Sequence, residues 1–114
     1  MIVTGVIECT DVVEPVSDAT LHIRLQDVSG ADASAEVLAD QVIRGISLSP
    51  PGESVAFAFE VPALEPRGIY AIEAHLDVTG SGEVAVGDFL TMEHFGVDPT
   101  LESQSVMVRV KQIR

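Results

Sequence analysis

The chain has 114 residues, a hydrophobic fraction of 46% and a formal net charge of -12. This length suits a single domain over residues 1–114, and the apolar content excludes an intrinsically disordered chain. The acidic residues are spread along the sequence and repel both phosphate backbones and anionic lipid headgroups, so nucleic acid and membrane surfaces are not expected partners. No apolar run is long enough for membrane insertion.

Seven extended segments follow one another, separated by clusters of Gly, Pro, Asp and Ser. The clearest two-residue period is in the fourth, where Val55, Phe57, Phe59 and Val61 face one way and the residues between them face the other. The predicted strands lie at residues 1–9, 19–27, 36–46, 55–61, 68–79 and 83–93, and around Val106, Val108 and Val110.

The third segment is less regular, because Leu38, Val42 and Ile46 also have helical spacing, and a short helix is the alternative there. Residues 79–82 predict a hairpin turn, and Gly87 begins a bulge or bend with the aspartate after it. The pattern as a whole predicts an all-β fold, an antiparallel two-sheet sandwich of about seven strands of the immunoglobulin or transthyretin type. The large side chains expected in its core are Phe57, Phe59 and Tyr70.

Several short blocks carry a family resemblance. They are Leu21-His22-Ile23-Arg24-Leu25-Gln26-Asp27-Val28-Ser29, Ala31-Asp32-Ala33, Val37-Leu38-Ala39 with Gln41 and Ile43, Phe57 with Phe59 and Glu60, Pro66-Arg67 with Tyr70 and Ala74, and Val108-Arg109-Val110. In this order, over residues 19–110, they resemble the YbaY/YscW-type lipoprotein family of small β-sandwich proteins from the Gram-negative envelope. The resemblance implies binding or envelope maintenance rather than catalysis.

Some members of that family are pilotins, which bind and escort secretin subunits to the outer membrane. The implied partner is therefore a peptide or protein, which exposed sheet edges or a gap between two sheets would accept in extended or amphipathic form. We do not expect residues 1–9 to be the signal peptide and lipobox of the family, because they lack a basic region and Glu8 precedes Cys9 where lipoprotein processing needs a small residue. Residues 84–100 are also more acidic than the family pattern. We expect an envelope location if an export segment has been removed, and a cytoplasmic one otherwise.

Metal binding is a second hypothesis. Glu73, His75 and Asp77 project from one face of the fifth strand, about 7 Å apart at each step. With His22 or His94 on a neighbouring strand, this set could hold zinc or copper in a small-ligand or metal carrier. Any solvated strand face shows the same alternation of polar residues, so no cofactor is expected from the pattern alone.

The remaining motifs are better explained as turns and core residues than as calcium-binding or catalytic sites. Residues 77–83 and 27–32 place oxygen ligands around turns but lack calcium-loop spacing, so plain turns are expected. There is no Gly-x-Ser-x-Gly elbow and no phosphate-binding loop, and Cys9, which has no second cysteine to pair with, is expected to be a buried thiol. The sequence therefore predicts a protein that is not an enzyme, and a purely structural domain is the third hypothesis.

Overall fold

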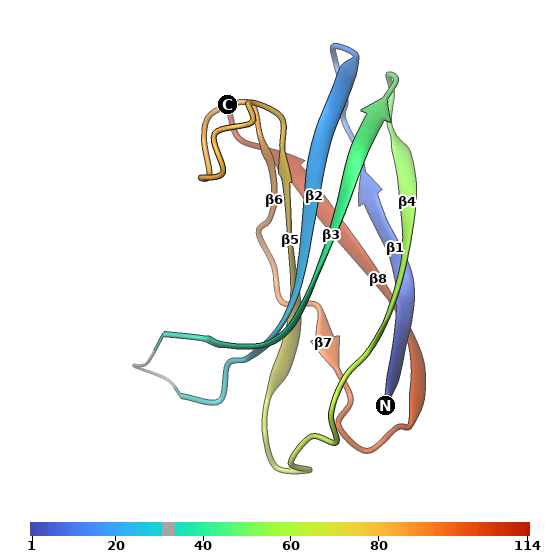
Figure 1. Cartoon of the computed structure of the whole chain (residues 1–114), viewed down its shortest axis with the longest axis vertical. Helices are drawn as coiled ribbons and strands as arrows, with labels where there is room; N and C mark the ends of the chain where they lie inside the picture. The colour runs from blue at the N-terminus through green and yellow to red at the C-terminus, as the bar shows by residue number, and fades with distance from the viewer. Residues whose placement is uncertain (31–33) are drawn as a thin grey trace.

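In the computed structural model, which describes residues 1–30 and 34–114, the regular structure is β-strand (Figure 1). The strands are β1 (Ile2–Cys9), β2 (Val16–Asp27), β3 (Glu36–Leu48), β4 (Glu53–Glu60), β5 (Tyr70–Asp77), β6 (Phe89–Thr91), β7 (Gly96–Val97) and β8 (Ser103–Gln112). The all-β prediction is confirmed, and the helical alternative for the third segment is wrong, because β3 is a strand throughout. Among the described residues no helix is long and apolar enough to span a membrane.

The strands form one hydrogen-bonded sheet in the order β3-β2-β5-β6-β8-β1-β4, with β7 also paired to β5. Six strand spacings of about 4.8 Å would place β3 about 29 Å from β4 in a flat sheet. Residues 49–52 join these two strands, and a connection of that length spans at most about 18 Å. The sheet must therefore curl until its edges meet at one end, which makes a barrel-like fold with an unpaired side.

This architecture corrects the predicted antiparallel two-sheet sandwich. The backbone pairing is continuous through one sheet, and β1 pairs with β8 in parallel, while the other neighbours are antiparallel. Alternation along a strand reports which face is buried but not which strand lies beside it, so the pattern could not distinguish one curled sheet from two stacked ones.

The predicted sixth strand is also shorter than expected. Residues 89–91 form β6, and residues 78–88 form one long connection in place of the predicted four-residue hairpin turn. The connection folds back because the carboxylates of Asp77 and Asp88 accept hydrogen bonds from its backbone, which a pairing strand would have used for the sheet. Strand β7 is two residues long, which is too short for an alternation of apolar and polar residues to predict it.

The core lies on the concave side of the curled sheet. Leu21, Ile23 and Leu25 of β2 are fully buried, and β2 pairs with β5 so that Leu21 lies opposite Leu76. Tyr70 and Phe57 are buried as expected, whereas Phe59 is only half-buried. The largest fully buried side chain is Phe89, which the sequence had not indicated as a core residue.

Candidate functional site

The two outer strands of the sheet have free edges. Within residues 1–30 and 34–114, β3 pairs only with β2, and β4 pairs only with β1. From the turn at residues 49–52, β3 and β4 run apart (Figure 1). We call the two facing free edges, of Glu36–Leu48 and Glu53–Glu60, the open seam. Free edges keep backbone N–H and C=O groups that a further segment of chain can bond, so the seam is a potential site for a peptide.

Apolar side chains reach the solvent along the seam. The inward residues of β2 are fully buried, but several apolar residues of the edge strands are only half-buried while still packing against the core. These residues are Leu38, Ala39, Ile43, Ile46, Val55 and Phe59. The seam therefore combines unpaired backbone with accessible apolar surface, which is what an extended or amphipathic segment needs for binding.

Gln41 is a polar residue on this apolar lining. It lies opposite Ile23 in the register of β2 and β3, between Ala39 and Ile43 on the face that looks into the core. Its Oε1 atom is shielded from solvent and accepts no hydrogen bond from the described residues. An amide oxygen in this position can accept a hydrogen bond from a ligand. In the sequence, Gln41 was part of a block of the family resemblance, which implied no role for its side chain.

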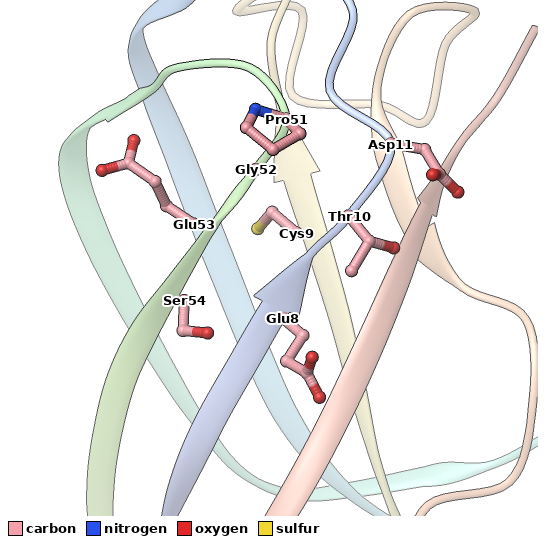
Figure 2. Close-up of a pocket in the computed structure, with 8 residues that line it drawn as sticks. All are labelled: Glu8, Cys9, Thr10, Asp11, Pro51, Gly52, Glu53 and Ser54. Atoms are coloured by element: carbon pink, nitrogen blue, oxygen red, sulfur yellow. The ribbon is translucent and has the colours of Figure 1, made fainter.

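A shallow hollow of about 350 Å³ lies at the end of β1, beside the turn that joins β3 to β4 (Figure 2). Glu8, Asp11 and Glu53 line it, and no basic residue does. The carboxylates of Glu8 and Glu53 point away from one another, so they do not form the converging pair that acid–base catalysis would need. Glu8 contacts Arg109 at 3.9 Å, so Asp11 and Glu53 supply the negative charge that the hollow offers to a cationic group.

Cys9 lies in the same hollow and is buried, as predicted. Burial, together with the smaller effect of the neighbouring charge of Glu53, raises the pKa of its thiol to about 11. Because the thiolate is the nucleophilic form and no histidine lines the hollow, Cys9 is inert near neutral pH.

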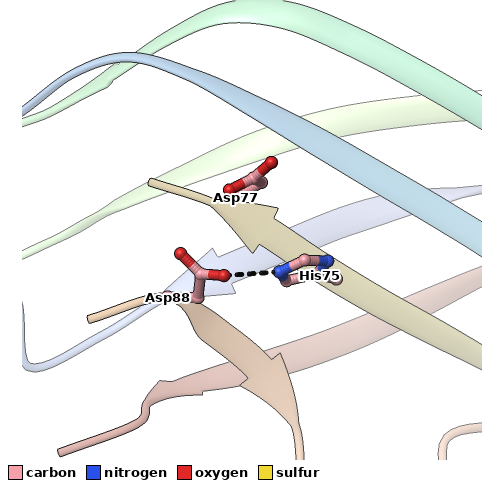
Figure 3. A group of neighbouring side chains, drawn as sticks. All are labelled: His75, Asp77 and Asp88. Carbon is pink, nitrogen blue, oxygen red and sulfur yellow. Dashed lines mark hydrogen bonds and ion pairs between the residues drawn. The ribbon is translucent and has the colours of Figure 1, made fainter. Parts of the chain in front are cut away.

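The predicted metal set on β5 is only partly brought together. His75 and Asp77 lie close to one another on the face of β5 opposite that of Leu76, and the third member of their group is Asp88, not Glu73 (Figure 3). We call His75, Asp77 and Asp88 the His75 clasp. Glu73 instead contacts Arg24 at 3.5 Å and accepts a hydrogen bond from Gln26.

Asp88 fastens the connection after β5. Its Oδ2 lies 2.8 Å from Nε2 of His75 and accepts the N–H of Ala85, and its Oδ1 accepts the N–H groups of Val78 and Thr79. The sequence could not reveal this role, because a Gly-Asp pair such as 87–88 is as typical of a bulge within a strand as of a turn between strands. The structure places it in a turn just before β6.

Asp77 fastens the same connection from the strand side. Its Oδ1 accepts the N–H of Gly80 at 2.9 Å, and its Oδ2 accepts that of Gly82 at 2.9 Å. Desolvation alone would raise the pKa of Asp77, but these backbone donors, with the charge of His75 and the hydroxyl of Thr79, hold it below its usual value. The carboxylate therefore orders residues 78–82, the segment that resembled a calcium loop.

The other histidines lie outside the clasp. The ring of His22 on β2 stacks on that of His75 with centroids 5.8 Å apart, but His22 contributes no ligand atom to the group. His94 is exposed in the segment between β6 and β7. In the second turn that resembled a calcium loop, Asp27 accepts the backbone N–H of Ser29, while Asp32 lies outside the described residues.

A small all-β protein with free apolar edge strands and a buried, unreactive cysteine has the features of a binding protein. The family model described as type III secretion system lipoprotein chaperone (YscW) matches residues 2–90, and the chain belongs to this family. The resemblance seen in the sequence is thereby confirmed. Because the family consists of chaperones, the protein is not an enzyme, as predicted.

The fold is also similar to a solved structure of an alternative pilotin from the type II secretion system of Vibrio cholerae. The two chains share 25% sequence identity with a TM-score of 0.68, over 98% of this chain and 97% of the pilotin. No curated protein matches the chain.

Proposed function

We propose that this protein is a pilotin-type chaperone of the bacterial envelope, which binds a segment of a secretin subunit and carries out no reaction. The observation that carries the proposal is the likeness to the type II pilotin over nearly the whole of both chains, together with the match to the lipoprotein chaperone family. This function also accounts for an edge-open sheet, which a purely structural domain would have reason to protect.

The segment binds along the open seam. Ile43 of β3 and Phe59 of β4 offer half-buried apolar surface there, and the free backbone edges supply hydrogen-bonding groups. The net charge of -12 and the acidic hollow at the end of the seam favour a segment with net positive charge, since complementary charge speeds association and suppresses wrong partners.

Fluorescence anisotropy with labelled peptides that tile the secretin of the same organism tests the proposal. At least one peptide should bind the wild-type protein, and Ile43→Ser or Phe59→Ser should weaken that binding about tenfold or more. Met107→Ser is the matched control, because Met107 is an exposed apolar residue on β8, away from the seam. Thermal melts identify any variant that is unfolded.

Two results would contradict this function. If no secretin peptide binds the folded wild-type protein, the pilotin assignment is wrong. If Met107→Ser weakens binding as much as the two seam substitutions, the peptide binds elsewhere on the sheet.

A further inference from the structure

The His75 clasp buries two carboxylates beside one imidazole. The exposed fractions of His75, Asp77 and Asp88 are 5%, 4% and 0%, and one possible ligand atom from each lies within 4.8 Å of the other two. In the described part of the chain no other group of His, Cys, Asp and Glu residues meets this description. The three residues come from two separate segments, the end of β5 and the turn before β6.

Among the described residues, His75 is the only basic side chain that pairs with the two carboxylates of this cluster. No described lysine or arginine forms an ion pair with Asp77 or Asp88, and the ion pairs of Arg24 and Arg109 are made with other carboxylates. Even with a protonated imidazole, two carboxylates leave the clasp one negative charge in excess. Five backbone N–H groups offset part of the cost of burying this charge, and a divalent cation would remove the excess charge that remains.

The backbone donors around the clasp would support a metal ion. Ligating carboxylates are normally hydrogen-bonded themselves, and these bonds fix their orientation. Oδ1 of Asp88 is held by two N–H groups, and Oδ2, which accepts the N–H of Ala85, also faces His75. Oδ2 of Asp77 accepts one N–H, from Gly82, and has a second lone pair free.

We propose that the His75 clasp is a site for a divalent transition metal such as Zn²⁺, bound by Nε2 of His75, Oδ2 of Asp88 and a carboxylate oxygen of Asp77. The ion takes the place of the proton between Nε2 of His75 and Oδ2 of Asp88: a neutral imidazole keeps that proton on Nδ1, and an imidazolium releases it to solvent. Metal–ligand distances of about 2.0 Å in a tetrahedron require the 2.8 Å contact to open by about 0.5 Å, and water completes the fourth position. The imidazole selects Zn²⁺ over Ca²⁺ and Mg²⁺.

Calorimetry and thermal melting of metal-stripped protein with ZnCl₂ test this site. Zn²⁺ should raise the melting temperature of the wild-type protein, and CaCl₂ and MgCl₂ should not. Asp77→Asn should weaken Zn²⁺ binding about tenfold or more. Glu73→Gln is the matched control: Glu73 lies on the same face of β5 as His75 and Asp77 but outside the clasp, so its variant should bind like wild type.

A direct measurement on the wild-type chain avoids dependence on variants that may misfold. The ring signals of His75 in NMR spectra should shift on adding Zn²⁺, while those of the exposed His94 should not. Absence of binding, equal binding by Asp77→Asn, or a shift confined to His94 would each overturn the proposal. None of these results bears on the secretin peptides, so this inference and the pilotin function can fail separately.

Discussion

The unpaired side-chain oxygen of Gln41 indicates a place where a binding partner can supply a hydrogen bond. Its neighbours on the core face of β3 are apolar, and its Oε1 atom is shielded without a hydrogen-bond donor among the described residues. An unpaired buried carbonyl costs about 1–3 kcal/mol, so retaining it in the folded state is unfavourable unless a partner supplies the donor. Its place on the open seam makes a bound segment the natural source of that donor.

Replacing this side chain should stabilise the free protein. We expect Gln41→Leu to raise the free energy of unfolding by about 1 kcal/mol, because the change removes the unpaired carbonyl and adds apolar surface. Urea denaturation measures the effect. Gln26→Leu is the control and should give no gain, since Gln26 donates a hydrogen bond to Glu73. A loss of stability in Gln41→Leu would mean that the amide is already satisfied in solution.

The thiol of Cys9 predicts a pH dependence in the alkaline range. Its pKa is raised from 9.0 to about 11 in the folded protein, so between these values the unfolded chain releases a proton that the folded chain keeps. Stability should therefore fall as the pH rises above about 9. Urea midpoints at pH 8 and pH 10 measure the fall, which should be smaller in Cys9→Ala. An identical fall in both proteins would assign it to other groups.

At the scale of the elements, periodicity predicts strands well and their partners poorly. The run from Val55 to Val61 and the alternation of Leu21, Ile23 and Leu25 predicted β4 and β2 because each buries one face. The parallel pairing of β1 with β8 joins residues about a hundred positions apart, and no local pattern encodes it. The role of Asp88 was hidden for the same reason, since it depends on contact with another strand.

The pairing of β1 with β8 depends on Gly5. A Cβ atom at this position would lie 1.8 Å from the backbone oxygen of Val106, so any side chain must push the two strands apart. Gly5→Ala should lower the free energy of unfolding by about 3 kcal/mol. Gly45→Ala is the control: the new Cβ meets nothing, and only its positive φ of 72° adds a cost, about 1 kcal/mol. Equal losses in urea denaturation would refute the close contact.

At the scale of the whole molecule, the curled sheet leaves its two edges unpaired on one side. The core-facing apolar residues of β2 and β5 are buried, while β3 and β4 carry half-buried apolar residues on either side of the seam. A free long edge is an aggregation risk that natural proteins usually cover, and the net charge of -12 keeps copies of this chain apart. A partner segment with positive charge would complete the sheet where a second copy is repelled.

The most direct test of this account is an NMR titration of ¹⁵N-labelled protein with the secretin peptide that binds it. We predict that backbone amide signals of β3 and β4 shift, together with the side-chain amide of Gln41, while those of β8 from Met107 to Lys111 stay in place. Shifts concentrated on β8 or on the connection after β5, with β3 and β4 unchanged, would contradict the assignment of the open seam as the binding site.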